Sequence, residues 1–503
     1  MKKKFLLFIN LLALLFAWQV SHIKEVSADD KIKVVTTFYP VYEFTKAVTG
    51  DSADVSMLIK AGTEPHDFEP STKNVATISD ADMFVYMDDS METWVKKVQK
   101  SINSDDLTVV KSTGDMLLMA GTAEEEEEGH EGHSHEYDPH VWLSPKRAVT
   151  LVENIRDAFV AKYPDKAETF KTNSAAYIEK LNDLDKKYSD ALSNAKQKSF
   201  VTQHAAFGYL ALDYGLNQIP FTGVSAESEP SAKRLASLTK YVKKYDIKYI
   251  YFEENASSKV AATLADEAGV KTAVLNPLES LTTKEIKAGE NYFTVMKDNL
   301  KALRLTTDVK GKEIKAETDD TKTVQHGYFK DKDVTDRKLT DWSGTWQSVY
   351  PYLLDGTLDE VWEYKADASK GEQTAQEVKD YYTTGYKTDV EKIIIDGKKN
   401  TVTFVKNGEE HKYIYKYVGY KILKYEKGNR GVRYLFEAKD DNAGDFKYIQ
   451  FSDHNISSTK AEHFHLFWGS TSQKAILKEM DNWPTYFPAS KSGQEIAQDL
   501  VAH

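Results

Sequence analysis

The 503-residue chain changes its pattern once, at a polar segment without aromatic residues over 306–325. Before this segment, short β-branched runs alternate with helical patterns, which is typical of a mostly parallel α/β sheet. After it, alternating runs rich in Tyr and Trp are separated by Gly-bearing turns, which is typical of an antiparallel barrel or sandwich. The sequence therefore predicts two domains of different fold class, 29–305 and 322–503, joined by a linker over 306–321.

The first 28 residues are typical of an export signal. Lys2–Lys4 are basic, Phe5–Val20 form an apolar stretch that is short for a membrane span, and Val26–Ala28 offer small residues for cleavage. This segment carries four Lys and one Glu, so its removal changes the formal net charge from −12 to −15. We expect an acidic protein that is exported, extracellular or at the cell surface and binds no nucleic acid; an uncleaved anchor is the alternative.

The absence of cysteine limits the chemistry of the chain, which contains 13 histidines. Disulfides, thiolate zinc sites and cysteine nucleophiles are excluded. His, Asp and Glu remain as candidate metal ligands.

The first domain is predicted to have two α/β lobes. Strands are expected over 32–38, 55–59, 81–87 and 107–111 in the first lobe and over 199–203, 247–252 and 271–275 in the second. From Asp165 to about Lys196 there is no Pro or Gly, and apolar residues recur at steps of three or four. This pattern predicts a long helix that connects the two lobes.

Four candidate ligands lie in ordered segments near predicted strand ends, where open α/β sheets bind their ligands. His66 lies in a loop closed by two prolines, His204 directly follows a strand, and Glu279 follows the next but one. His140 stands in an apolar segment bracketed by prolines. If the strand ends of the two lobes face each other, the four residues meet in one cleft. Three imidazoles and one carboxylate are a complete tetrahedral zinc set.

Residues 121–137 form a low-complexity loop ahead of His140. Five consecutive glutamates over 124–128 precede His130, His133 and His135. This composition indicates either an acidic spacer or a loop that binds cations weakly, because its histidines need not be pre-organised.

A second cluster of histidines lies near the end of the chain. His463 and His465 are two apart on a predicted strand over 461–468, so their imidazoles share one face. His454 could bring a third imidazole to the same place, leaving a fourth zinc position open. The alternative is two surface histidines with a chance neighbour. His326 is a further candidate for the fourth ligand.

Long motifs in both domains resemble known families. Those of the first domain are Thr36-Thr-Phe-Tyr-Pro40, Gly62-Thr-Glu-Pro-His66, Asp138-Pro-His-Val-Trp-Leu-Ser-Pro145, Gln203-His-Ala-Ala-Phe-Gly208 and Asn276-Pro-Leu-Glu279. They resemble the zinc-binding solute receptors of bacterial ABC importers (the ZnuA/AdcA type, cluster A-I). Those of the second domain are His326-Gly-Tyr-Phe329, Asp341-Trp-Ser-Gly-Thr-Trp-Gln-Ser-Val-Tyr-Pro351, Phe451-Ser-Asp-His454 and His463-Phe-His465. They resemble ZinT, a zinc-binding protein with a lipocalin-like (calycin) barrel.

The resemblance implies a receptor, not an enzyme, that captures Zn²⁺ and delivers it to a membrane permease. It implies a first zinc site made by His66, His140, His204 and Glu279. It also implies a second, auxiliary site made by His454, His463 and His465. Members from Gram-positive bacteria usually carry a lipid-anchoring cysteine, and this sequence departs from that pattern. We expect a monomer.

Three other functions compete with zinc uptake. Manganese receptors of this type use more carboxylate and less imidazole, so the set of three His and one Glu favours zinc. A zinc hydrolase also holds its metal with three His and an open position, but the sequence has no HExxH, and Glu462 should face away from the two strand histidines. A surface adhesin is the third alternative, since related receptors are often described as adhesins.

Overall fold

The computed structural model describes residues 31–102, 106–121, 137–220, 232–253, 258–312, 324, 327–369, 371–425 and 428–502. The predicted signal segment, most of the loop over 121–137, and His326 lie outside these residues. Within the described part of the chain, no helix is long and apolar enough to cross a membrane.

The first lobe is a parallel sheet with the strand order β2-β1-β3-β4. Its strands are β1 (Ile32–Thr36), β2 (Ala53–Met57), β3 (Met83–Tyr86) and β4 (Thr108–Lys111), and its helices are α2 (Tyr39–Thr49), α3 (Thr72–Ser79) and α4 (Val95–Ser101). All four residues of β3 are buried, as expected for a parallel strand covered on both faces.

The second lobe repeats this plan with the strand order β6-β5-β7-β8. Its elements are β5 (Ser199–Thr202), α7 (Gly208–Asp213), β6 (Asn217–Pro220), α8 (Ala232–Tyr245), β7 (Tyr249–Phe252), α9 (Ser258–Ala268), β8 (Lys271–Val274), α10 (Thr283–Ala288) and α11 (Tyr292–Thr307). Sequence reasoning had no strand at β6, whose residues are polar or only half-buried.

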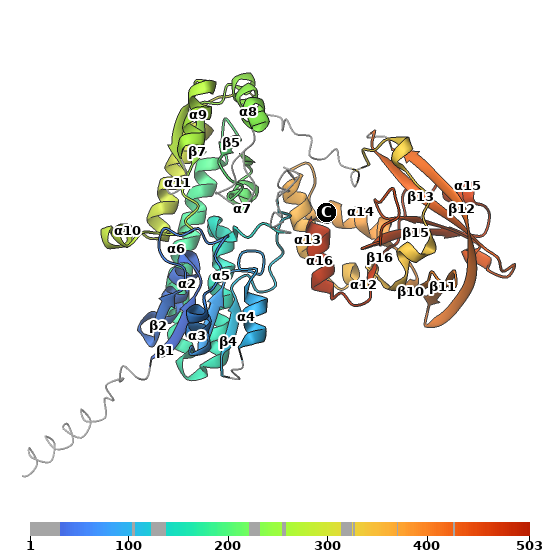
Figure 1. Cartoon of the computed structure of the whole chain (residues 1–503), viewed down its shortest axis with the longest axis horizontal. Coiled ribbons are helices and arrows are strands. Elements are labelled where there is room, and N and C mark those ends of the chain that lie inside the picture. The colour runs from blue at the N-terminus through green and yellow to red at the C-terminus, as the bar shows by residue number, and fades with distance from the viewer. Residues whose placement is uncertain are drawn as a thin grey trace, which may run out of the picture.

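The two lobes are joined by α5 (Pro145–Lys162) and the long helix α6 (Ala167–Leu192), as Figure 1 shows. The 26 residues of α6 span about 39 Å at ~1.5 Å per residue. Its buried side chains recur every three or four residues, from Phe170 to Leu192. They pack on α2 and α5 on the side of the first lobe and on α11 of the second lobe. One hydrophobic core therefore runs through both lobes.

The second domain is a closed antiparallel barrel with the strand order β10-β11-β12-β13-β14-β15-β16-β9. The strands are β9 (Gly344–Ser348), β10 (Val390–Asp396), β11 (Thr401–Lys406), β12 (Glu409–Lys424), β13 (Arg430–Ala438), β14 (Tyr448–Ser452), β15 (Phe464–Gly469) and β16 (Thr485–Pro488). Phe464 and Leu466 of β15 point into the barrel core, where Trp342 stacks on Phe451. Phe464 and Leu466 alternate with His463 and His465 along the chain, so they lie on the opposite face.

A layer of helices covers part of the barrel and faces the first domain (Figure 1). It contains α12 (Tyr350–Leu354), α13 (Asp359–Ala368), α14 (Ala375–Tyr386) and α16 (Gly493–Ala502), while α15 (Gln473–Ile476) lies against β15. Their cluster of buried apolar residues includes Leu117 of the first domain, so the two domains share packed surface.

The predicted fold class is confirmed. The chain is a two-lobed α/β domain with a long connecting helix, followed by a mostly β barrel domain of the lipocalin-like type. The alternating pattern that predicted strands in this domain gave no indication of the helices α13 and α14.

Candidate metal centres

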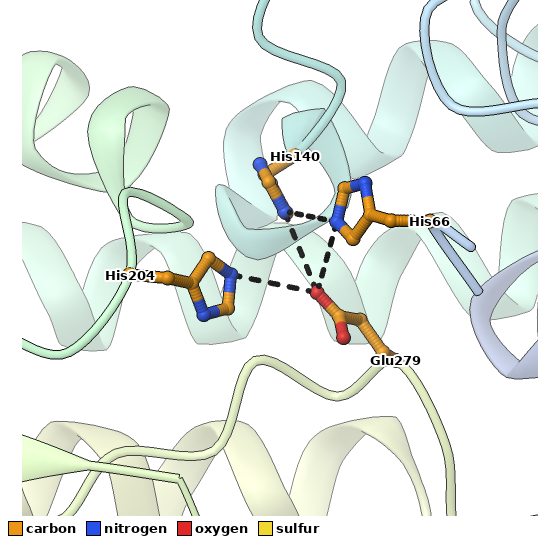
Figure 2. A group of neighbouring side chains, drawn as sticks. All are labelled: His66, His140, His204 and Glu279. Carbon is orange, nitrogen blue, oxygen red and sulfur yellow. Dashed lines mark hydrogen bonds and ion pairs between the residues drawn. The ribbon is translucent and has the colours of Figure 1, made fainter. Parts of the chain in front are cut away.

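Four side chains meet between the two lobes, each from a loop that follows a strand or precedes a helix. His66 lies in the loop after β2, and His140 directly precedes the short 3-10 helix Val141–Leu143. His204 follows β5 by two residues, and Glu279 lies in the loop after β8. Figure 2 shows the four pointing toward one another. The structure thus brings together all four residues that the sequence predicted for the first site.

The distances in this group match the edges of a zinc tetrahedron. Bonds of ~2.0–2.1 Å place the ligand atoms of a tetrahedral zinc about 3.3 Å apart. The Nε2 atoms of His66 and His140 are 3.1 Å apart. Glu279 Oε1 lies 3.5, 3.4 and 3.5 Å from the Nε2 atoms of His66, His140 and His204. All four ligand atoms lie within 4.8 Å of one another, so they can bind one small cation.

This first cluster is buried. The side chains of His66, His140, His204 and Glu279 are 1%, 0%, 0% and 7% exposed. The Nε2 atom of His204 and the Oε1 atom of Glu279 are buried without a hydrogen bond. Burial of such atoms without a partner is unfavourable, and a bound cation would satisfy both.

Two carboxylates contact the Nδ1 atoms of two of the imidazoles, on the side away from the cluster. Asp138 Oδ1 lies 2.7 Å from His140 Nδ1 and also accepts a hydrogen bond of 3.0 Å from the His140 backbone N–H. Glu253 contacts His204 Nδ1 in the same way. Each contact places the proton on Nδ1 and leaves Nε2 as the metal-binding atom. The sequence analysis did not identify Glu253. This residue directly follows β7, so it lies at the same edge of the sheet as His204.

The buried charges shift the proton affinities of the site. Burial lowers the pKa of His66 to about 4. Burial also disfavours protonated His140 and His204, but Asp138 and Glu253 outweigh it, so both pKa values are raised. Burial and the charge of Glu279 raise the pKa of Glu64 to about 9. A divalent cation would replace the protons held on His140 and His204.

The second predicted set also converges. His454, His463 and His465 each offer a nitrogen within 4.8 Å of the others, and their ring centroids are 5.5–6.0 Å apart. His463 stacks on Phe487, and His465 Nδ1 lies 2.8 Å from Thr485 Oγ1. His454 is exposed, whereas His463 and His465 are half-buried. The cluster can hold a metal from one side and leave the other side to solvent.

The turn that presents His454 is anchored inside the barrel. His454 has a φ of 62°, which side chains other than Gly seldom adopt. The preceding residue, Asp453, is buried and forms an ion pair of 2.5 Å with the fully buried guanidinium of Arg337. Arg337 also stacks over Trp342 at 4.1 Å. Sequence reasoning found the histidines but not this anchor.

Family comparisons agree with both domains. Residues 34–305 match the zinc-uptake complex component A family (ZnuA, periplasmic). Residues 320–503 match the ZinT (YodA) family, described as periplasmic, lipocalin-like and zinc-recruiting. The chain therefore belongs to the ZnuA class of zinc-binding solute receptors, extended by a ZinT domain.

Two relatives share this extended architecture. The zinc-binding protein AdcA of Streptococcus pyogenes serotype M6 is 66% identical, with all of both chains covered. The zinc-binding lipoprotein AdcA of Streptococcus pneumoniae (strain R6) is 62% identical, again over all of both chains. The chain is thus an AdcA-type zinc-binding receptor for zinc uptake, and this family is not one of enzymes.

Two solved structures are also informative. Zn(II)-bound AdcA from Streptococcus pneumoniae is 61% identical with a TM-score of 0.83, covering 94% of this chain and 100% of that one. A mutant of the laminin-binding adhesin Lmb from Streptococcus agalactiae is 32% identical with a TM-score of 0.50, covering 55% of this chain and 99% of that one.

Proposed function

We propose that the chain captures Zn²⁺ with His66, His140, His204 and Glu279 and delivers it to the permease of an ABC importer. The observation that carries this proposal is the set of 3.1–3.5 Å distances among the four ligand atoms. Four protein ligands leave no open position on zinc, which suits capture and not catalysis. Release then requires movement of a lobe or a loop when the receptor meets its permease.

The three barrel histidines form a second, auxiliary zinc site in this proposal. Its exposed side allows zinc to enter from solvent and to leave again. We infer that it collects zinc and passes it to the first site when zinc is scarce. The domain limits 29–305 and 322–503, and weak additional binding by the loop over 121–137, belong to the same proposal.

The proposed delivery of zinc to a membrane permease requires the protein to lie outside the cell membrane. We infer a monomer that is exported and held at the cell surface by its permease or another contact, or released. The pneumococcal relative is described as a lipoprotein, whereas the printed sequence has no cysteine. Retention at the surface would then differ between the two proteins.

Zinc uptake in a deletion strain tests the proposal. The strain is complemented with the wild-type gene, with His140→Ala/His204→Ala, or with His463→Ala/His465→Ala, and uptake of radioactive zinc is measured at two zinc levels. We expect the first pair to abolish uptake at both levels. We expect the second pair to lower uptake only under severe limitation. Unchanged uptake with the first pair would contradict the proposed first site, and unchanged uptake with the second pair under limitation would contradict the auxiliary role.

Adhesion is the second candidate function. The likeness of the first domain to a laminin-binding adhesin favours it. Binding of the purified protein to immobilised laminin, with and without zinc, separates adhesion from transport. If the first pair of substitutions abolishes uptake and leaves laminin binding intact, the two functions use different parts of the molecule.

A further inference from the structure

The barrel domain binds a short segment of the first domain, Asp115–Met119, which we call the docking segment. Gln498 of α16 accepts a hydrogen bond of 2.7 Å from the Leu118 N–H and donates one of 2.7 Å to the Leu118 carbonyl. The Tyr364 hydroxyl of α13 donates to the Leu117 carbonyl at 2.6 Å. Leu117 itself is 1% exposed within the apolar cluster of the barrel helices.

The docking segment is paired with the short segment Tyr137–Asp138 that leads to His140. Met119 accepts a hydrogen bond of 2.9 Å from the Asp138 N–H, and Ala120 forms an antiparallel bridge with Tyr137. The Tyr209 hydroxyl ties the two together, because it accepts from the Met119 N–H at 2.8 Å and donates to the Asp138 carbonyl at 2.7 Å. The carboxylate of Asp138 then orients the imidazole of His140.

A second route runs through Arg147 at the start of α5. Its guanidinium makes two hydrogen bonds of 2.8 Å to the buried carboxylate of Asp213. It also contacts the Tyr364 hydroxyl and lies between two rings, 4.7 Å from Tyr364 and 4.9 Å from Tyr209. Tyr364 of the barrel domain and Tyr209 of the first domain thus pack on the same half-buried cation.

The space around Asp138 is narrow. A Cβ atom on Gly208 would lie 2.8 Å from Asp138 Oδ2, which is closer than such atoms approach in proteins. A small displacement of the docking segment would therefore move Asp138 against its neighbours or away from His140.

We propose that Tyr364 and Gln498 of the barrel domain are positioning residues for the first zinc site. They hold the docking segment and Arg147, which fix Tyr209 and Asp138, which in turn fix the imidazole of His140. By linkage, zinc bound at the first site strengthens the docking of the barrel domain by the same factor. This inference rests on the proposed zinc site at His66, His140, His204 and Glu279.

Substitutions in the full-length protein test the proposal. Tyr364→Phe removes the hydroxyl and keeps the ring, and Tyr364→Phe/Gln498→Leu removes both polar contacts. All variants are made with His463→Ala/His465→Ala, so that zinc competition with a chelator reports the first site alone. Loss of a residue that orients a metal ligand weakens metal binding about 10–100-fold. Because these residues act on Asp138 only through the docking segment, Arg147 and Tyr209, we expect about three- to tenfold for the single variant and more for the double variant.

A spectroscopic measurement separates positioning from general damage. Co²⁺ bound in place of zinc reports ligand geometry through its visible absorption bands, and we expect these bands to weaken or shift in both variants. Tyr382→Phe is the matched control, because its ring packs between Trp362 and Tyr386 within the barrel domain. We expect wild-type zinc affinity and the wild-type spectrum from this control.

The outcomes are distinguishable. Wild-type affinity together with the wild-type Co²⁺ spectrum in Tyr364→Phe and in the double variant would overturn the positioning role. If the double variant does not fold, Tyr364→Phe decides alone, since its ring packing is retained. In the same background, His140→Ala tests the site itself. If that variant keeps first-site zinc, the proposed function fails and not only its coupling to the barrel domain.

Discussion

The two histidine clusters of this protein consist of similar groups but differ in burial and in the number of ligand atoms. The first is buried between two lobes, has four ligand atoms at tetrahedral spacing, and has carboxylates behind two of its imidazoles. The second lies on the barrel, has three imidazoles, and exposes His454 to solvent. Burial and full coordination favour retention of zinc, while exposure and an open position favour exchange. The difference agrees with the proposed roles of a tight capture site and a faster collecting site in one chain.

The largest expected effect on zinc binding is the loss of a ligand from the first site. His204→Ala removes a buried ligand whose Nε2 atom otherwise has no hydrogen bond. We expect first-site zinc affinity to fall by at least about a hundredfold, more than for loss of an outer contact. Competition with a chelator measures it, and His411→Ala in strand β12 is the control. Equal effects of the two substitutions would contradict the role of His204 as a ligand of the first site.

The second prediction concerns the scaffold of the open site. Arg337→Met leaves Asp453 buried without its cation, and burial already raises the pKa of that carboxyl. Removal of one partner from a buried ion pair destabilises by about 3–5 kcal/mol. We expect thermal unfolding of the barrel domain at a clearly lower temperature.

Arg430→Met is the matched control for this effect. Its partner Asp331 is 76% exposed, and ion pairs with an exposed partner contribute about 0–1 kcal/mol. Similar unfolding temperatures for the two variants would contradict the view that the Arg337–Asp453 pair supports the His454 turn.

The third prediction concerns the carboxylate of Glu253, which contacts His204 in the first site. Glu253→Gln keeps the shape of the side chain and removes the charge that faces His204 Nδ1. We expect first-site zinc affinity to fall about 10–100-fold, and second-site affinity to stay unchanged, because Glu253 lies in the first domain against His204. Isothermal titration of the full chain with one site disabled at a time measures both. A loss at the second site would show that the two sites are not independent.

The smallest expected effect is a difference in proton release. Neighbouring carboxylates raise the pKa of His140 and His204 against burial, whereas burial lowers the pKa of His465 to about 3. Zinc binds only neutral imidazole. First-site affinity should therefore fall as the pH decreases through the neutral range, while His465 stays neutral and adds no such dependence. We expect zinc to release about one proton more from the first site than from the second at pH 7.

Titration calorimetry in buffers of different ionisation enthalpy counts these protons. The measurement uses the same pair of single-site variants as above. Equal proton release from the two sites would mean that the carboxylates behind His140 and His204 do not hold protons on them.

Local patterns were enough to predict which residues gather in the two clusters. His204 and Glu279 follow parallel strands, and the carboxyl ends of such strands meet at one edge. His463 and His465 lie two apart on a strand, so they share a face. These signals lie within a few residues of each ligand.

Contacts between distant segments could not be predicted in this way. The pairing of Glu253 with His204 joins loops that follow two different strands, and Arg337 contacts Asp453 over an interval of 116 residues. Tyr364 reaches Leu117 over an interval of 247 residues. Such contacts depend on how the elements pack and leave no periodicity in the sequence.

Zinc stoichiometry of the full chain tests the central claim most directly. The protein is stripped with a chelator, reloaded, washed and analysed for metal, alongside His140→Ala/His204→Ala and His463→Ala/His465→Ala. We expect at least two zinc ions on the wild-type chain, with one lost in each variant. Two zinc ions retained by the first variant, or manganese retained in preference to zinc by the second, would contradict a zinc capture site between the lobes.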